Sequence, residues 1–155
     1  MQISAQVDYA VRAMTELAAV QAADPDRRET TQTLATRQEI PFHYLERILG
    51  KLRAAGLVDS RRGADGGYRL SVPADQITVA DIIRVLDGPL GAVRNDAPEA
   101  VAYTGPAQHL RTVWVATRAA MRSVLENTTL ADVVAGHTSP LMDDLLASPG
   151  AWDRR

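Results

Sequence analysis

Cysteine is absent from this sequence of 155 residues, and lysine and phenylalanine occur once each. Without cysteine the chain can form no disulfide, no thiolate zinc site and no cysteine-held iron–sulfur cluster. The three histidines, His43, His109 and His137, stand far apart and lack the spacing of metal ligands. We therefore expect neither a metal nor a cofactor.

Long apolar runs and catalytic motifs are missing as well. No stretch reaches the roughly 18 uninterrupted apolar residues of a membrane span, and the N-terminus lacks the pattern of a signal peptide. The glycine-rich segment 63–67 lies between two predicted strands, whereas a phosphate-binding loop joins a strand to a helix. No acid–base pair stands at a workable spacing from a nucleophile. These absences predict a cytoplasmic protein that is not an enzyme and has no membrane partner.

Helical periodicity is the main feature that is present. Apolar residues recur every three or four positions, which predicts amphipathic helices over 4–22, 31–37, 41–55, 78–86 and 107–126. Two Thr-x-x-Asp sequences, at 78–81 and 129–132, have the spacing of capping boxes. The second opens a short helix that Gly136 ends, and a weak last helix follows Ser139.

The period changes after the third predicted helix. Residues 57–62 and 68–72 read as short strands on either side of the turn 63–67, which predicts a β-hairpin with a flexible tip. Three helices followed by such a hairpin make a winged helix-turn-helix. We therefore expect a mainly α fold with a small β-hairpin, joined by an irregular connector at 88–106 to a long dimerisation helix.

The net charge is unevenly distributed. The whole chain carries −2, from 17 basic and 19 acidic residues. Segment 37–72, which covers the third helix and the hairpin, has seven basic and four acidic residues and carries +3. The segments before and after it carry −2 and −3. The positive charge therefore lies on the elements that a winged helix places against DNA.

The candidate DNA-binding residues come from the third helix and the hairpin. In the major groove an arginine can donate to guanine and a glutamate can accept from cytosine. Hairpin arginines can contact phosphates or enter the minor groove. A merely solvated charged face is the alternative. The predicted DNA contacts are His43, Tyr44, Glu46, Arg47, Lys51, Arg61, Arg62 and Arg69.

Several motifs carry a family resemblance. The segments DYAVRA at 8–13, YLERIL at 44–49 and RGADGGYRL at 62–70 resemble those of the IscR/NsrR-type winged-helix transcription regulators, often called the Rrf-two family. The resemblance covers about residues 1–135. It implies a homodimeric DNA-binding protein, usually a repressor, in which Glu46 matches the recognition glutamate and Arg62 the wing arginine.

The resemblance also implies that the long helix crosses its counterpart in the dimer. The apolar stripe of this helix agrees, because it is larger than a lone terminal helix can bury. A helix packed only on its own domain is the alternative. The predicted interface consists of Leu110, Val113, Trp114, Thr117, Met121, Val124 and Leu125.

The connector departs from the family pattern. Many members hold an iron–sulfur cluster there with three cysteines, whereas this chain resembles the cysteine-less branch, which responds to small molecules or partner proteins. We place a candidate effector pocket at Asp8, Tyr103 and Trp114. The alternatives are a surface carboxylate for Asp8 and core or interface positions for the two aromatic residues.

These inferences divide the chain into a winged helix-turn-helix at 1–87, the connector at 88–106, the dimerisation helix with a following short helix at 107–136, and a tail at 137–155. The predicted function is a homodimeric, sequence-specific transcription regulator that binds double-stranded DNA and lacks an iron–sulfur cluster. The alternative is a winged-helix adaptor that binds another protein and has no specific DNA target.

Overall fold

The computed structural model describes residues 2–63 and 65–153. Ala64 in the predicted hairpin turn, Met1 and the last two residues of the predicted tail lie outside this range. The described helices are α1 (Ala5–Ala23), α2 (Thr31–Gln38), α3 (Phe42–Ala54), α4 (Val79–Leu86), α5 (Leu110–Leu125), α6 (Leu130–Ala135) and α7 (Pro140–Ala147). Strands β1 (Val58–Arg61) and β2 (Gly67–Leu70) form an antiparallel hairpin. The expected mainly α fold with a small β-hairpin is thereby confirmed.

The helix ends follow local capping chemistry. The Ser4 hydroxyl accepts from the amide of Val7 at the start of α1. Both predicted capping boxes are present, because the side chains of residues 78 and 81, and of residues 129 and 132, satisfy each other's backbone amides. Gly136 ends α6 with a φ of 68°, a conformation that glycine adopts without a Cβ penalty.

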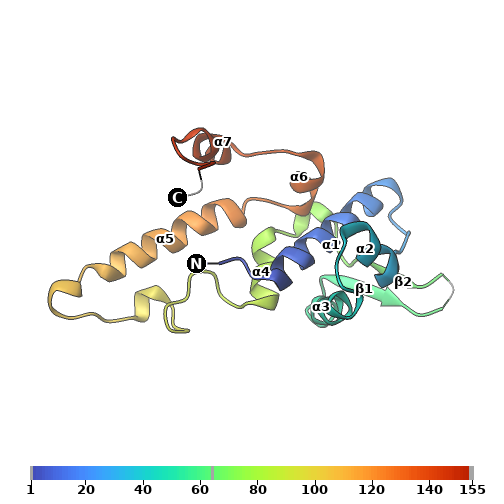
Figure 1. The fold of residues 1–155 in the computed structure, drawn as a ribbon, viewed down its shortest axis with the longest axis horizontal. Coiled ribbons are helices and arrows are strands. Elements are labelled where there is room, and N and C mark those ends of the chain that lie inside the picture. The colour runs from blue at the N-terminus through green and yellow to red at the C-terminus, as the bar shows by residue number, and fades with distance from the viewer. Residues whose placement is uncertain (1, 64, 154–155) are drawn as a thin grey trace.

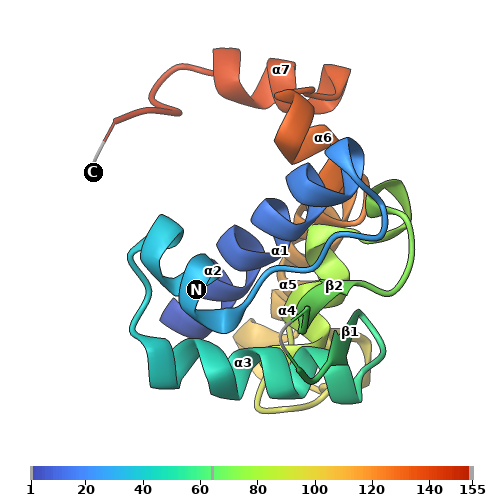
Figure 2. The ribbon, with the colours of Figure 1, turned by 90° about the vertical axis from the view of Figure 1, so that its right-hand side faces the viewer.

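The core is built around α1, which α2, α3, α4 and α6 surround (Figures 1 and 2). Met14 and Leu17 of α1 are almost fully buried, as are Leu34 of α2 and Leu49 of α3. Each helix contributes one apolar stripe to this centre, as the periodicity of the sequence predicts. The opposite side of α3 therefore stays available to solvent.

Helix α6 follows the C-terminal end of α5 and packs against this core. Residues 78 and 129 form an antiparallel bridge, in which the amide of Val79 donates to Thr128 O and the amide of Leu130 donates to Ile77 O, each at 2.9 Å. Leu130 has no exposed surface and belongs to the same cluster as the residues of α1. The predicted segments 1–87 and 107–136 therefore share one core.

Helix α5 extends away from that core, and the connector runs beside it (Figure 1). It begins at residue 110, three residues later than expected, because Gly105–Ala107 form a separate 3-10 turn with Pro106 inside it. Although the structure describes every residue of α5, none of the sixteen is buried. No helix in the described part of the chain is long and apolar enough to cross a membrane.

Candidate nucleic-acid interface

The turn between α2 and α3 fixes the direction of α3. Glu39 ends α2 in the left-handed region, with a φ of 53°, and its amide donates to the carbonyls of α2. The next residue, Ile40, is buried and donates to Ala35 O at 2.9 Å. This combination of a left-handed residue and a buried apolar neighbour stops one helix and redirects the chain into the next.

Side-chain contacts tie this turn to α1. The Arg12 guanidinium donates to the side chain of Gln38 at 3.2 Å and also to its carbonyl oxygen. The Gln38 amide then donates to Glu16 at 2.6 Å. These bonds connect the end of α2 to the first helix.

The two faces of α3 differ sharply. Leu45, Ile48, Leu49 and Leu52 are buried, whereas His43, Glu46, Arg47 and Lys51 are exposed. His43 Nδ1 and Glu46 Oε2 lie 3.8 Å apart, one helical turn from each other. The exposed face thus presents a carboxylate, an imidazole and two cations, which are groups that can pair with base edges and phosphates.

Two other predicted contacts on α3 have partners within the chain. The ring of Tyr44 lies edge-on against Tyr9 of α1, with 5.6 Å between the ring centroids, and it stays 40% exposed. Lys51 Nζ donates to Gln6 Oε1 at 3.1 Å. An ammonium group has three donors, so Lys51 keeps two for another partner.

The hairpin supplies the wing of this fold. Its register pairs Val58 with Leu70 and Arg61 with Gly67, so the turn between the strands forms the tip. Arg61 and Arg62 are exposed at this end. The wing as an element lies next to α3, because α3 leads directly into β1 (Figure 2).

Arg69 lies differently from the other wing arginines. Its guanidinium is 3.1 Å from an oxygen of Asp26 and 3.5 Å from one of Asp59. Arg69 pairs with Asp59 across the hairpin ladder, so the two side chains share one face of the sheet. The guanidinium therefore faces acidic side chains at the base of the wing.

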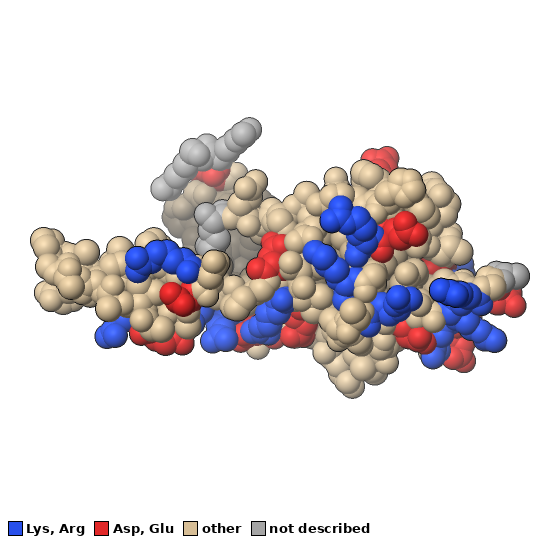
Figure 3. All heavy atoms as spheres, turned by 90° about the horizontal axis from the view of Figure 1, so that it is seen from below, with Lys and Arg blue, Asp and Glu red and all other residues tan. Residues whose placement is uncertain are grey.

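A view from below shows where the charges gather. Lys and Arg side chains cluster over the part of the molecule that contains α3 and the wing, with acidic side chains between them (Figure 3). This distribution agrees with the +3 charge of segment 37–72. A surface of this kind attracts a polyanion even though the whole chain is slightly acidic.

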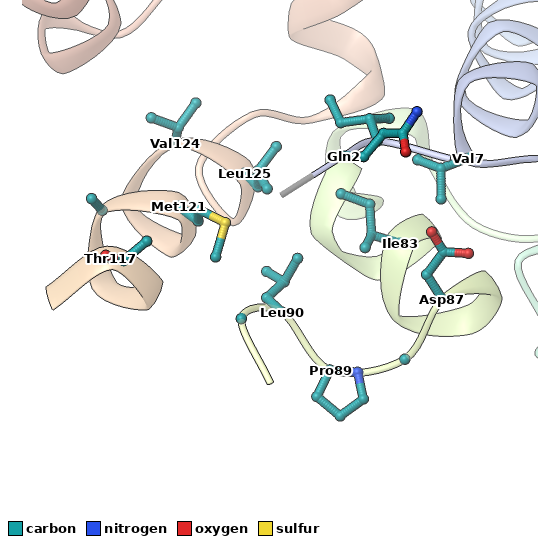
Figure 4. Close-up of a pocket in the computed structure, with 14 residues that line it drawn as sticks. Gln2, Val7, Ile83, Asp87, Pro89, Leu90, Thr117, Met121, Val124 and Leu125 are labelled. Atoms are coloured by element: carbon teal, nitrogen blue, oxygen red, sulfur yellow. The ribbon is translucent and has the colours of Figure 1, made fainter. Parts of the chain in front are cut away.

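Two hollows adjoin α5. The larger, of about 770 Å³, lies between the start of α1, α4, the beginning of the connector and α5. Apolar side chains dominate its walls, among them Val7, Ile83, Leu90, Met121 and Leu125 (Figure 4). The smaller, of about 490 Å³, lies between the connector and α5. Both hollows run along the apolar stripe of α5.

The predicted interface residues follow this stripe. Thr117, Met121, Val124 and Leu125 line the larger hollow, and Trp114 lines the smaller one. Val113 is 53% exposed. Leu110 at the start of the helix is partly buried.

The three residues predicted for an effector pocket are not brought together. Only Trp114 lines one of the two hollows. Asp8 pairs with Arg12 on the exposed side of α1, with 3.3 Å between the charged atoms. Tyr103 is partly buried in the connector and lines neither hollow.

Comparisons with known proteins agree with this geometry. A family model described as "Rrf2: Iron-dependent Transcriptional regulator" matches residues 3–136. The chain belongs to the Rrf2 family. Its members are DNA-binding transcription regulators, and the identification made from the motifs is confirmed.

Relatives of the Rrf2 protein match nearly the whole chain. The HTH-type regulator Rv1287 of Mycobacterium tuberculosis is 46% identical over 151 residues, which cover 95% of this chain and 92% of the relative. CymR of Bacillus subtilis is 39% identical over 135 residues, with coverages of 87% and 91%. The solved structure of CymR, the global cysteine regulator of B. subtilis, superposes with a TM-score of 0.73 at 36% identity; the match covers 89% of this chain and 99% of the CymR chain.

Iron is the one property in the family description that the residues of this Rrf2 protein do not fit. The chain has no cysteine. Across residues 2–63 and 65–153, no group of three or more His, Cys, Asp or Glu side chains is placed to hold a metal ion. Iron ligands in proteins are thiolates, imidazoles and carboxylates gathered around one point. The donor set of this chain therefore provides no iron site among the described residues.

Sequence reasoning missed two residues that contact α3 and the wing. Gln6 connects Lys51 to the end of α4, because its amide donates to Leu86 O at 3.1 Å and to Asp87 at 2.6 Å. Arg28, in the loop before α2, contacts both wing strands. Neither residue belongs to a periodic pattern or a motif, so the sequence held no signal for them.

Proposed function

We propose that this protein is a homodimeric, sequence-specific transcription regulator of the Rrf2 family that acts as a repressor without an iron–sulfur cluster. The observation that carries this proposal is the pairing of two exposed surfaces. One is the polar face of α3, which bears Glu46 and Arg47, and the other is the wing tip with Arg61 and Arg62. A helix in the major groove and arginines against the backbone read one half-site together.

We infer the dimer from the apolar stripe of α5, which the described part of the chain does not bury. A helix of sixteen residues with no buried side chain gains little from packing, yet isolated helices of this length are only marginally stable in water. The larger hollow continues this stripe and is lined by apolar side chains (Figure 4). A second copy of the chain covers both surfaces in a symmetric arrangement and places two α3 helices on one DNA duplex.

The proposed regulatory site lies between the connector and α5. Gly91 brings the connector so close to α5 that a Cβ there would lie 2.9 Å from Met121 Cε. A molecule bound in the smaller hollow would therefore touch both the connector and the dimer helix. In this proposal an effector shifts the spacing of the two α3 helices by binding better to one arrangement of the dimer.

The DNA-binding proposal is tested with the purified chain and duplexes from the region upstream of its own gene. We expect one duplex to shift in a gel and to resist competition by unrelated DNA, with affinity falling steeply as salt rises. Shuffled duplexes of the same composition are the control. Equal affinity for every duplex would refute sequence-specific binding and favour the adaptor alternative.

The repressor and effector parts need separate measurements. A reporter driven by the bound duplex should be less active when the protein is present, and higher activity would make the protein an activator. Thermal unfolding against a panel of metabolites should reveal a compound that raises the melting temperature. That compound should also change the affinity for the bound duplex, and a stabilising compound without this effect would not be an effector.

A further inference from the structure

The loop before α2 pairs with strand β2 of the wing, and we call this contact between Glu29 and Tyr68 the wing root. The amide of Glu29 donates to Tyr68 O at 2.9 Å, and the amide of Tyr68 donates to Glu29 O at 2.8 Å. Gly67 has a φ of 135°, and a Cβ there would lie 2.6 Å from Glu29 O. The loop therefore pairs with β2 like a short third strand, at a point where only glycine allows the close approach.

The guanidinium of Arg28 spans both strands of the wing at this root. One terminal nitrogen donates to the Asp59 carboxylate at 2.7 Å. The other lies 3.3 Å from Asp59 O and 3.5 Å from Gly67 O. Asp59 belongs to β1 and Gly67 opens β2, so a single planar group connects the two strands to the loop. The Arg28 side chain is only 13% exposed.

A row of alternating charges extends this contact. Asp59 accepts from Arg28 and faces Arg69, and Arg69 reaches back to Asp26 in the same loop as Arg28. The hydrogen bond from Arg28, together with the charge of Arg69, lowers the pKa of Asp59 below its ordinary value. The carboxylate is therefore ionised and holds both arginines at the base of the wing.

We propose that Arg28 is a positioning residue for DNA recognition. It holds the wing, through Asp59, at the angle from which Arg61 and Arg62 reach the DNA backbone while α3 occupies the major groove. Arg69 belongs to the same group of paired charges, which we call the brace and which consists of Asp26, Arg28, Asp59 and Arg69. In this proposal Arg69 positions the wing and does not contact DNA. This inference rests on the proposed DNA-binding function, and it adds to it the element that sets the distance between the two contact surfaces.

Binding measurements on variants test the proposal. Arg28→Met should weaken binding to the preferred duplex about tenfold, because the wing no longer meets its phosphates. The slope of log affinity against log salt concentration should decrease by the equivalent of about one or two phosphate contacts. Hydroxyl-radical footprints should lose protection where the wing contacts the DNA and keep it where α3 binds. Arg28→Lys should not restore either property, since an ammonium group cannot span both strands.

A double-mutant cycle separates positioning from general damage. In a variant that already carries Arg61→Ala and Arg62→Ala, the further change Arg28→Met should leave affinity unchanged, because no tip arginine remains to be positioned. Arg69→Met should behave in the same way. An additive loss in either cycle would overturn the proposal. Arg84→Met, which removes one positive charge from α4, is the control and should keep the wild-type salt dependence and footprint.

Amide hydrogen exchange provides a readout that does not depend on DNA. Arg28→Met should speed exchange at Tyr68 and Glu29, whose amides form the root, and leave the core amides of α1 as in the wild type. If exchange at the amides of Tyr68 and Glu29 were unchanged, the proposal that Arg28 positions the wing would be refuted, even if DNA binding became weaker. Failure of the wild-type protein to prefer any duplex would instead refute the proposed function, so the two failures are distinct.

Discussion

At the scale of single residues, the predicted DNA contacts divide into side chains that are well exposed and side chains that face acidic groups of the same chain. Glu46 and Arg62 are exposed, and both were predicted from the motifs. Arg69 was predicted with them, but its guanidinium faces Asp26 and Asp59. The exposure of Glu46 and Arg62 could be predicted from the sequence because they lie on a helix face and beside a turn, whose local geometry is known. It missed the partners of Arg69 because they depend on how a distant loop folds back.

Replacing Arg62 should weaken DNA binding without changing which sequence is preferred. Arg62→Ala removes one cation at the wing tip, so we expect weaker binding to all duplexes and a salt slope smaller by about one. Titration at several salt concentrations measures this. Arg84→Ala is the control, and a loss confined to the preferred duplex would instead assign Arg62 a role in base recognition.

Replacing Glu46 should have the opposite signature. Its carboxylate can accept from a cytosine amino group, so Glu46→Ala should reduce discrimination at one base pair by about 1–3 kcal/mol. Binding to duplexes with each of the four base pairs at every position measures the change. Glu46→Gln is the matched control, because it keeps the shape and one acceptor. Preference that survives the alanine change at every position would exclude Glu46 as a reader.

At the scale of elements, α4 and α6 begin side by side with the same capping chemistry. Thr78 and Thr129 are bridged, and each accepts from the amide of an aspartate three residues later. The boundaries of such helices were predictable because caps and apolar periods are local. The pairing of the two helix starts was not, because it joins residues about fifty positions apart and leaves no trace in either segment.

The Asp81 carboxylate should make α4 sensitive to acid. Partial burial tends to raise the pKa of Asp81, but hydrogen bonds from the Thr78 hydroxyl and amide and the charge of Arg84 outweigh it and lower the pKa. Because the pKa is lowered, the ionised Asp81 carboxylate stabilises the folded state at pH values above its ordinary pKa of 3.8. This contribution is lost as the pH falls through the pKa of the folded state.

Asp81→Asn should therefore cost about 1 kcal/mol near pH 7. The gap to the wild type should stay constant down to about pH 5 and close toward about pH 2. Denaturant unfolding across this range measures it. Asp75→Asn, an exposed neighbour before α4, should leave stability unchanged. A gap that widens in acid would contradict the assignment.

At the scale of the whole molecule, the apolar stripe of α5 is the main surface that the described part of the chain leaves uncovered. Helix α5 starts at residue 110 instead of the predicted 107, because a proline-containing 3-10 turn precedes it. The 3.6-residue period therefore does not mark where a helix begins. The period did find the stripe itself, because it depends only on spacing along one helix. Which surface covers the stripe depends on tertiary and quaternary packing, which no periodicity encodes.

A charge in this stripe should break the proposed dimer. Met121 lines both hollows, so Met121→Glu should shift the protein toward monomers in sedimentation velocity and weaken binding to a duplex with two half-sites. Ala119 lies on the opposite side of α5 and is exposed, so Ala119→Glu is the matched control. A Met121→Glu protein that remained folded and dimeric would show that the second copy binds elsewhere.

The return of α6 to the core has a consequence for synthesis of the chain. Leu130 fills the centre beside α1, although more than a hundred residues separate the two along the sequence. On the ribosome, α3 and the wing emerge well before Leu130, the residue that closes their core. A chain that stops before residue 130 leaves an apolar centre open, and exposed apolar surface of this kind makes an incomplete product prone to aggregation and proteolysis.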